Sequence, residues 1–213
     1  MVWVPGGGFQ RGGTAVKKTL PDLCVDRLET TPPEYEACVT AGKCTAQGVD
    51  CAAQSTYGKP ERAKHPMVCI VFAQAEAYCA FRGKRLPTTE EWEWVARGGN
   101  EARRYAWGDA APDSQLCWAG KQKQSESCDV GSFPGDASAQ GVLDMAGNVL
   151  EFTTTDGDKS SKIRIARGGS WNSGAAELFR NTRLGGFGLD YRCAFLGVRC
   201  VQEAPQSQAG TSQ

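Results

Sequence analysis

The chain has 213 residues and a formal net charge of zero, with 24 basic and 24 acidic side chains. A nucleic-acid-binding protein would carry a basic excess or a basic stripe, so we expect no nucleic-acid partner. No stretch is apolar over the length needed to cross a bilayer, and we expect no membrane-spanning segment. The first residues have neither the basic start nor the apolar run of a secretory leader, which we expect to be absent from this chain.

The ten cysteines are the most informative part of the composition. An even number in a chain of this size favours disulfides and an oxidising compartment, so we predict an extracytoplasmic protein, whether secreted, on the cell surface or periplasmic. Zinc is the alternative, but the chain has no C-x-x-C pair and only one histidine, His65, which is expected to be structural or solvent-exposed. Cys117 and Cys128 bracket a short polar loop and are expected to pair.

The first predicted elements are short and separated by turns. Val2 to Phe9 is predicted to be a strand that runs into a glycine-rich turn, and Leu23 to Arg27 a second short strand. Thr31 precedes two prolines, which fit the first turn of a helix that Gly42 ends. Residues 43 to 64 are polar and irregular, and a loop of this length is usually functional or pinned.

Two further helices and a strand are predicted in the remainder. Val68 to Phe72 leads into a helix over residues 73 to 82, and a capping box at Thr88 begins the next helix. Ile163 to Ala166 is predicted to be a short strand. Residues 202 to 213 lack apolar side chains and are predicted to be a disordered tail. No repeat or shift in composition divides the rest, so residues 1–201 are predicted to form one α+β domain.

After the strand predicted from Ile163 to Ala166, the chain has an unusual composition. Large apolar side chains are scattered among glycines and arginines over residues 172 to 195, with neither helical nor strand periodicity. A loop that merely connects two elements would be more polar. Aromatic side chains exposed on a rigid scaffold are common anchors of binding surfaces, so this composition indicates a ligand-binding segment.

Six motifs occur in an order that resembles the formylglycine-generating-enzyme, or sulfatase-modifying-factor, domain family. They are Trp3–Phe9, Gly83–Glu93, Tyr105–Gly108, Val130–Pro134, Asp144–Phe152 and Arg167–Trp171. The resemblance covers residues 2 to 201 and implies a variant of the C-type lectin fold, with a small irregular β core and flanking helices. It also implies a disulfide between Cys79 and Cys200, which match a family pair.

Catalytic members of this family carry a cysteine pair after the Gly-Gly-Ser motif, and these soft thiolates bind Cu(I). The matching positions here are Ser173 and Leu178, neither of which binds copper in that way. Iron-dependent members need a histidine cluster that one histidine cannot supply. The resemblance therefore predicts neither copper nor iron and no enzymatic activity. The alternative is a metal-dependent oxidoreductase of the same family with an unrecognised metal site.

The calcium motif of the family is better preserved. Asp144, Gly147, Val149 and Glu151 match the positions that bind a structural Ca²⁺, two through side chains and two through backbone carbonyls. Carboxylates, carbonyl oxygens and a bend permitted by glycine suit this ion. The resemblance thus predicts one structural calcium ion.

The 172–195 segment also resembles the diversified region of variable proteins encoded by diversity-generating retroelements. Mutagenic copying there alters adenines and leaves codons that end in a pyrimidine. From Asn172 to Val198, Glu177 is the only residue that such a codon cannot encode. We therefore predict a surface that binds a protein or other macromolecule. The predicted contacts are Asn172, Ser173, Gly174, Leu178, Phe179, Asn181, Leu184, Phe187, Leu189, Tyr191, Cys193, Ala194 and Phe195.

Alternative interpretations stay open at several of these positions. Trp171 is expected in the core, and Leu189 or Phe195 fits burial in a terminal strand. Cys193 is either free or disulfide-bonded, and its presence makes the cysteine count even, which favours a bridge. The partners considered for it are Cys38, Cys44 and Cys51. A third hypothesis is a sensor or structural domain of an extracellular assembly.

Overall fold

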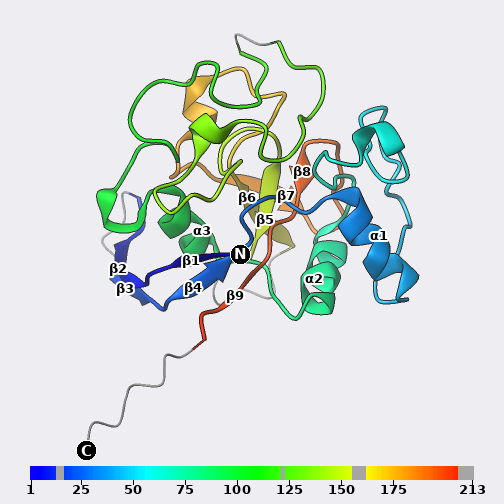
Figure 1. Cartoon of the computed structure of the whole chain (residues 1–213), viewed down its shortest axis with the longest axis horizontal. Coiled ribbons are helices and arrows are strands. Elements are labelled where there is room, and N and C mark those ends of the chain that lie inside the picture. The colour runs from blue at the N-terminus through cyan, green and yellow to red at the C-terminus, as the bar shows by residue number, and fades with distance from the viewer. Residues whose placement is uncertain (13–16, 121–122, 155–161, 206–213) are drawn as a thin grey trace, which may run out of the picture.

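The computed structural model describes residues 1–12, 17–120, 123–154 and 162–205. Within these ranges the chain forms small sheets, three α-helices and long irregular connections, which confirms the predicted α+β class (Figure 1). The α-helices are α1 (Pro32–Thr40), α2 (Phe72–Phe81) and α3 (Thr89–Ala96). Short 3-10 helices are η1 (Pro60–Arg62), η2 (Gly99–Glu101), η3 (Pro134–Asp136) and η4 (Ala176–Phe179). No helix in the described ranges is both long and apolar enough to cross a membrane.

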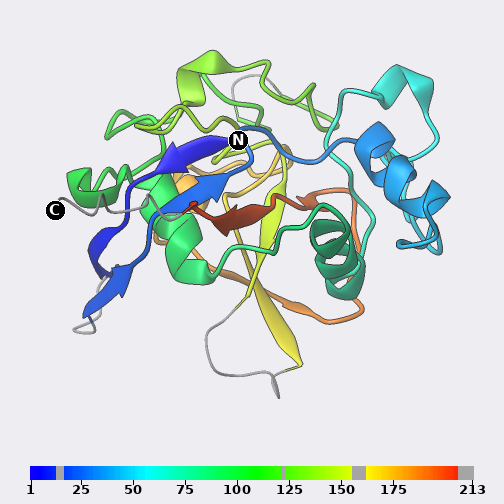
Figure 2. The same ribbon diagram turned by 60° about the horizontal axis from the view of Figure 1, so that its bottom comes forward.

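One sheet brings the beginning and the end of the described chain together. Its antiparallel strands, in order, are β1 (Val2–Val4), β4 (Leu23–Val25) and β9 (Val201–Glu203). Figure 2 shows β9, in red, beside β4, in blue. The predicted tail therefore begins too early, because Gln202 and Glu203 pair with Cys24 and Leu23 of β4, which satisfies their backbone groups. Residues 206–213 of that tail lie outside the described residues.

A separate antiparallel hairpin consists of β2 (Gly7–Gln10) and β3 (Lys17–Leu20). The single strand predicted from Val2 to Phe9 is divided at Pro5, which has no N–H for a sheet hydrogen bond. β3 was not predicted, since its Lys-Lys-Thr-Leu sequence lacks apolar alternation. The hairpin packs Phe9 edge-on against Trp94 of α3, at a ring-centroid distance of 6.0 Å. It lies at the opposite end of the molecule from α1 and α2 (Figures 1 and 2).

The largest sheet supports the 172–195 segment. Its strands, in order, are β7 (Gly185–Gly188), β6 (Ile163–Arg167), β5 (Leu150–Thr153) and β8 (Leu196–Gly197). Glu151 of β5 lies opposite Arg167 of antiparallel β6 and beside Gly197 of parallel β8. The segment therefore leaves and rejoins the fold on the two sides of a single buried strand.

Local capping explains where the helices begin. Thr88 Oγ1 accepts a hydrogen bond from the Glu91 backbone N–H at 3.1 Å, and Glu91 Oε2 accepts one from the Thr88 N–H at 2.8 Å. This confirms the predicted capping box. The helix predicted after Thr31 is α1, and Glu34 Oε2 accepts from the Thr31 N–H at 2.8 Å. α2 begins at Phe72, one residue before the predicted start.

Disulfides join the irregular parts of the described chain. They are Cys38–Cys44, Cys51–Cys69, Cys79–Cys200 and Cys117–Cys128, so both predicted pairs are present. The bridge expected for Cys193 is wrong, because its three candidate partners are bonded elsewhere. Cys193 and Cys24 are the unbonded cysteines of the described residues. Cys79–Cys200 joins α2 to the end of the chain across 121 residues of sequence.

Candidate functional site

The 172–195 segment follows a turn that requires glycine. Gly168 and Gly169 have φ values of 103° and 71°, a backbone region that residues with a Cβ rarely adopt. A Cβ on Gly169 would lie 2.7 Å from the Phe179 ring. The Ser170 N–H donates to Ser173 Oγ at 3.1 Å and the Ser173 N–H to the Ser170 carbonyl at 2.9 Å, which closes the turn.

Trp171 joins the two ends of the segment. Its backbone N–H donates to the Asn148 carbonyl at 2.7 Å, and its indole Nε1 donates to the Ala194 carbonyl at 2.9 Å. The half-buried ring packs against a small cluster that contains Val68 and Val149. Trp171 is thus part of the support of the segment, in line with its expected core role.

Three predicted ligand contacts are buried and need correction. Phe179 has 0% exposure and packs edge-on against Trp118, at a ring-centroid distance of 5.4 Å. Asn181, at 1% exposure, donates through Nδ2 to the Arg103 carbonyl at 3.0 Å. Ala194 is 6% exposed. These side chains cannot reach a ligand because they hold the segment to the core.

The exposed apolar side chains of the segment lie before and after β7, one of the two edge strands of this sheet in the described residues. Leu184 is 36% and Tyr191 42% exposed, and the Tyr191 ring lies 5.2 Å from that of Phe187. Phe187 and Leu189 are half-buried against the main core cluster, and Phe187 connects Tyr191 to it. Among the other predicted contacts, Asn172 and Gly174 are exposed, and Ser173, Leu178, Cys193 and Phe195 are half-buried.

The end of the segment is joined to the 43–64 region. Arg192 Nη1 donates to the Gln47 carbonyl at 2.9 Å, and a Cβ on Gly48 would collide with the Arg192 guanidinium. The Cys69 N–H donates to the Cys193 carbonyl at 3.1 Å. Burial raises the pKa of the Cys193 thiol to about 11, so the thiol is protonated at neutral pH. The polar loop, pinned by two disulfides, therefore borders the exposed surface.

The two positions that match the copper cysteines of catalytic relatives offer no sulfur. Ser173 Oγ accepts a bond within its own turn, and Leu178 belongs to η4. Across the described ranges, no three histidine, cysteine, aspartate or glutamate side chains gather in a group able to hold a metal ion.

One of the predicted calcium residues, Glu151, forms an ion pair with an arginine. Arg199 Nη2 donates to Glu151 Oε1 at 2.7 Å, and Trp92 Nε1 donates to Glu151 Oε2 at 2.6 Å. Asp144 Oδ2 accepts from the Gly131 N–H at 2.6 Å. Because Arg199 and Trp92 already engage both oxygens of Glu151, this arrangement does not fit a calcium site. Calcium binding through Asp144, Gly147, Val149 and Glu151 thus finds no support in the geometry.

Other buried carboxyl groups lie near this ion pair. Burial raises the pKa of Glu29 well above its usual range and that of Asp136 to about 8, and nearby Asp144 adds to both shifts. Burial raises the pKa of Asp144 itself to about 6. Glu29 accepts from the Val149 N–H at 3.2 Å and from Asn148 Nδ2 at 2.5 Å. These raised pKa values favour the neutral form of the buried carboxyl groups, which lowers the cost of their burial.

His65 has polar neighbours that its sequence position did not indicate. Its Nδ1 lies 2.9 Å from Ser127 Oγ, and its Nε2 lies 3.6 Å from Asp129 Oδ1. Ser127 is only 3% exposed, which does not suit a nucleophile that must meet a substrate. In the same region the Val130 N–H donates to the Lys64 carbonyl at 2.8 Å. His65 thus joins two segments, as a structural histidine would.

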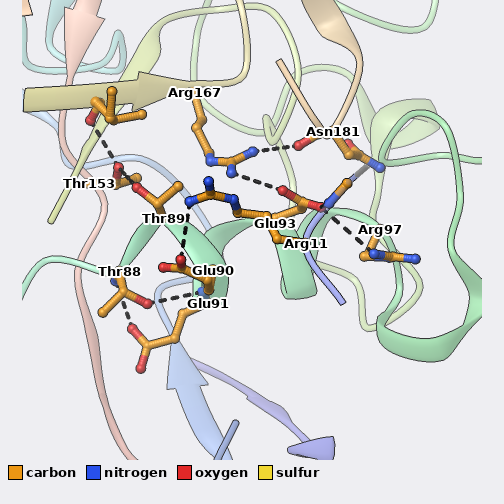
Figure 3. A network of polar contacts seen from close by, with 12 residues as sticks. Arg11, Thr88, Thr89, Glu90, Glu91, Glu93, Arg97, Thr153, Arg167 and Asn181 are labelled. Atoms are coloured by element: carbon orange, nitrogen blue, oxygen red, sulfur yellow. Dashed lines mark hydrogen bonds and ion pairs between the residues drawn. The ribbon is translucent and has the colours of Figure 1, made fainter. Parts of the chain in front are cut away.

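A network centred on Arg167 and Glu93 was not predicted (Figure 3). Both side chains are at most 1% exposed, and Arg167 Nη2 lies 2.9 Å from Glu93 Oε2. Arg167 Nη1 also donates to the Asn181 carbonyl at 2.6 Å. Beside this network is a cavity of about 400 Å³. Its lining residues come from three distant parts of the chain, so no local sequence pattern could have indicated it.

The segment, its glycine turn and the small sheets together define a C-type lectin-like scaffold of the formylglycine-generating-enzyme type. Residues 1–204 match the family described as the sulfatase-modifying factor enzyme 1-like domain, and the chain belongs to this family.

Known relatives include both inactive and active proteins. The chain is 35% identical over 161 residues to the inactive C-alpha-formylglycine-generating enzyme 2 of Bos taurus, covering 69% of this chain and 53% of that protein. It is 40% identical over 114 residues to the formylglycine-generating enzyme of Mycobacterium tuberculosis, covering 45% and 35%. The matched part of the chain thus spans about half the length of the first relative and about a third of the length of the second.

A solved structure has the same fold across nearly the whole chain. Treponema denticola variable protein 1 superposes with a TM-score of 0.74 and 19% identity, covering 96% of this chain and 95% of that one. At this identity the likeness shows the fold alone. Family membership and fold are therefore established, and the residues of the site must decide between catalytic and binding roles.

Proposed function

We propose that this chain is a non-catalytic binding protein whose ligand surface is the exposed part of the 172–195 segment. The proposal is carried by Ser173 and Leu178, which stand where the family resemblance places the copper cysteines, in a segment that still presents Leu184 and Tyr191 to solvent. The similarity to an inactive relative supports the same conclusion.

The proposed contacts form a smaller set than the sequence predicted. Leu184, Phe187 and Tyr191 supply the apolar anchors, and the buried Phe179, Asn181 and Ala194 supply the support. Aromatic anchors with few rotatable bonds, held on a rigid base, are typical of protein-recognition surfaces. The ligand proposed is accordingly a protein or another macromolecule.

The proposed biological setting is the variable protein of a bacterial or phage diversity-generating retroelement. Two observations support it: every residue of the segment except Glu177 can be encoded by a codon that ends in a pyrimidine, and the fold is shared with a Treponema denticola variable protein. The decisive test is the surrounding DNA. We expect a near-repeat of the codons for residues 171–199, differing only at adenines, beside a reverse-transcriptase gene. Without such a repeat the retroelement assignment fails, although a binding role would still stand.

An extracytoplasmic location is part of the proposal. It is supported by the four disulfides of the described residues, which persist in oxidising compartments. Fractionation of the native host, followed by immunoblotting, tests it. Recovery of the protein in the cytoplasm with reduced cysteines would contradict the location.

The second candidate is an oxidoreductase of the same family, which the relationship to an active Mycobacterium tuberculosis enzyme favours. Anaerobic titration with Cu(I) and with Fe(II), followed by turnover of a sulfatase-type cysteine peptide, separates the candidates. We expect no stoichiometric binding of either soft metal ion and no formylglycine product. Stoichiometric binding with turnover would overturn the binding-protein proposal.

A further inference from the structure

The cavity beside the Arg167–Glu93 network has an unusual concentration of positive charge. Its volume of about 400 Å³ falls within the range of small-molecule sites. Glu93 is the acidic residue that lines it. The arginines that line it are Arg11, Arg97, Arg103, Arg104 and Arg180. In a chain with no net charge, these arginines create a local positive field.

The carboxylate of Glu93 is already engaged by groups in the cavity wall. Its Oε2 is engaged by the buried Arg167 at 2.9 Å, and its Oε1 accepts from the Gly12 N–H at 3.0 Å and lies 3.7 Å from Arg97 Nη1. Glu93 is 1% exposed, so its carboxylate belongs to the wall and not to the open space of the cavity. Figure 3 shows this carboxylate between the Arg167, Arg97 and Arg11 side chains.

Three of the lining arginines have acidic partners. Arg11 Nη1 lies 3.3 Å from Glu90 Oε1, and Arg103 Nε lies 2.7 Å from Glu101 Oε2. Arg97 is paired with Glu93 and also donates to the Gln10 carbonyl at 3.0 Å. Its guanidinium lies 5.6 Å from the centroid of the Phe9 ring. These contacts hold the three guanidinium groups in place around the cavity.

Arg104 and Arg180 differ from the other three. Neither has an acidic partner or a side-chain hydrogen bond among the described residues, and both are exposed. Their backbones are nevertheless held. The Arg104 carbonyl accepts from the Asn181 N–H at 3.0 Å, and the Arg180 carbonyl accepts from the Arg183 N–H at 2.8 Å. The Asp109 carboxylate accepts from the Arg104 backbone N–H at 2.8 Å, which also anchors this residue. Arg104 and Arg180 therefore line one cavity from anchored backbone positions, and neither guanidinium group forms an ion pair among the described residues.

We propose that this cavity binds a compact anion that carries two negative charges on oxygen atoms. The guanidinium fork donates paired N–H groups in the geometry that phosphate and carboxylate oxygens accept. Two such groups without acidic partners match a dianion, whereas a monocarboxylate would leave one arginine uncompensated. A phosphate monoester and a dicarboxylate share this chemistry. The site does not rest on the proposed binding role of Tyr191, which is not among its lining residues.

The test is calorimetric titration at pH 8 and low ionic strength, where charge interactions are weakly screened. The probes are inorganic phosphate, malonate and sulfate as dianions, with acetate as the singly charged control. We expect saturable binding of at least one dianion at one site per chain, and binding of acetate about tenfold weaker or less. Comparison of phosphate with malonate then distinguishes the two sources of the anion.

The variants Arg104→Gln and Arg180→Gln should each weaken dianion binding about tenfold, the loss typical of one charge-assisted hydrogen-bonded contact. Arg183→Gln is the matched control, because Arg183 is an exposed arginine of the same segment outside the cavity lining. Thermal melts check that all three variants are folded. The proposal is overturned if no dianion binds saturably, if acetate binds equally well, or if the double variant of Arg104 and Arg180 still binds.

Discussion

Arg199 and Glu151 form a bidentate ion pair in which both side chains are 1% exposed. Arg199 Nη2 and Nε donate to Glu151 Oε1 at 2.7 and 3.0 Å. The guanidinium also donates to the Leu143 carbonyl at 2.7 Å and to the Asp26 carbonyl at 2.9 Å. One arginine near the end of the chain thus connects the central strand β5 with two distant loops.

Replacing Glu151 by glutamine should destabilise the protein by about 3–5 kcal/mol, because it leaves the Arg199 charge buried without its partner. Urea unfolding measures this loss. The matched control is Glu203→Gln, which removes the exposed partner of Arg85 and should cost about 1 kcal/mol or less. A cost for Glu151→Gln no larger than that of the control would contradict the structural role of the pair.

Calcium should not raise the melting temperature. Glu151 is engaged by Arg199 and Trp92, so a calcium ion would have to displace these donors to use it. Melting curves in millimolar CaCl₂ and in EGTA are expected to coincide. A melting temperature that rises when calcium is added, and that no longer rises in the Asp144→Asn variant, would instead support the calcium ligation predicted from the sequence.

The variants Phe179→Ala and Tyr191→Ala distinguish a buried residue that stabilises the 172–195 segment from an exposed residue proposed to bind the ligand. Phe179→Ala should cost about 3–5 kcal/mol through the cavity left beside Trp118. Tyr191→Ala should change stability by about 0.5 kcal/mol or less, as for most surface positions. Denaturant unfolding measures both. If Tyr191→Ala proves as costly as Phe179→Ala, the hypothesis of a purely structural domain gains over a binding surface.

Acidification should destabilise the joint between His65 and the 126–130 region. Burial lowers the pKa of His65, although Asp129 and Glu126 partly oppose this shift. The folded state therefore binds fewer protons here than the unfolded state, so stability falls as pH drops through the unfolded histidine value of about 6.5. His65→Gln should show a weaker fall between pH 7.5 and 5.5 in thermal melts. An equal fall in both proteins would contradict this role.

Thiol counting tests the disulfide pattern. Unfolding without reductant should expose two free thiols, from Cys24 and Cys193, to a thiol-specific reagent. In the folded protein Cys193 should react slowly at pH 8, because burial raises its thiol pKa to about 11. Peptide mapping after alkylation assigns the modified residues. Recovery of Cys193 in a disulfide-linked peptide would restore the bridge favoured by the even cysteine count.

Local chemistry in the sequence was sufficient for several elements. The capping box at Thr88, the prolines after Thr31 and the short strand before Arg167 each act within a few residues, so their patterns are readable directly. β3 and β9 are polar strands that exist because a neighbouring strand supplies backbone partners. No local pattern encodes such a partner.

The candidate site likewise has residues that local sequence predicts and residues whose role depends on distant parts of the chain. The residue types of the 172–195 segment indicated a surface, and Leu184 and Tyr191 are indeed exposed. The burial of Phe179 depends on Trp118, which is distant in sequence. The family resemblance predicts that Glu151 is a calcium ligand, whereas its contact with Arg199, 48 residues away, exists only in the folded chain. Arg104 and Arg180 line the same cavity only because the intervening chain folds back.

The position of Glu151 between Arg167 and Gly197 has a consequence for protein engineering. Strands two places apart in a sheet are separated by about 10 Å, so the segment is a loop with closely spaced, rigidly held ends. Doubling the length of such a loop costs only about 0.6 kcal/mol of closure entropy. The exposed parts of the stretch between the two anchors are therefore expected to accept insertions, provided that the buried Phe179, Asn181 and Ala194 are kept and the Arg199–Glu151 pair holds the stem closed.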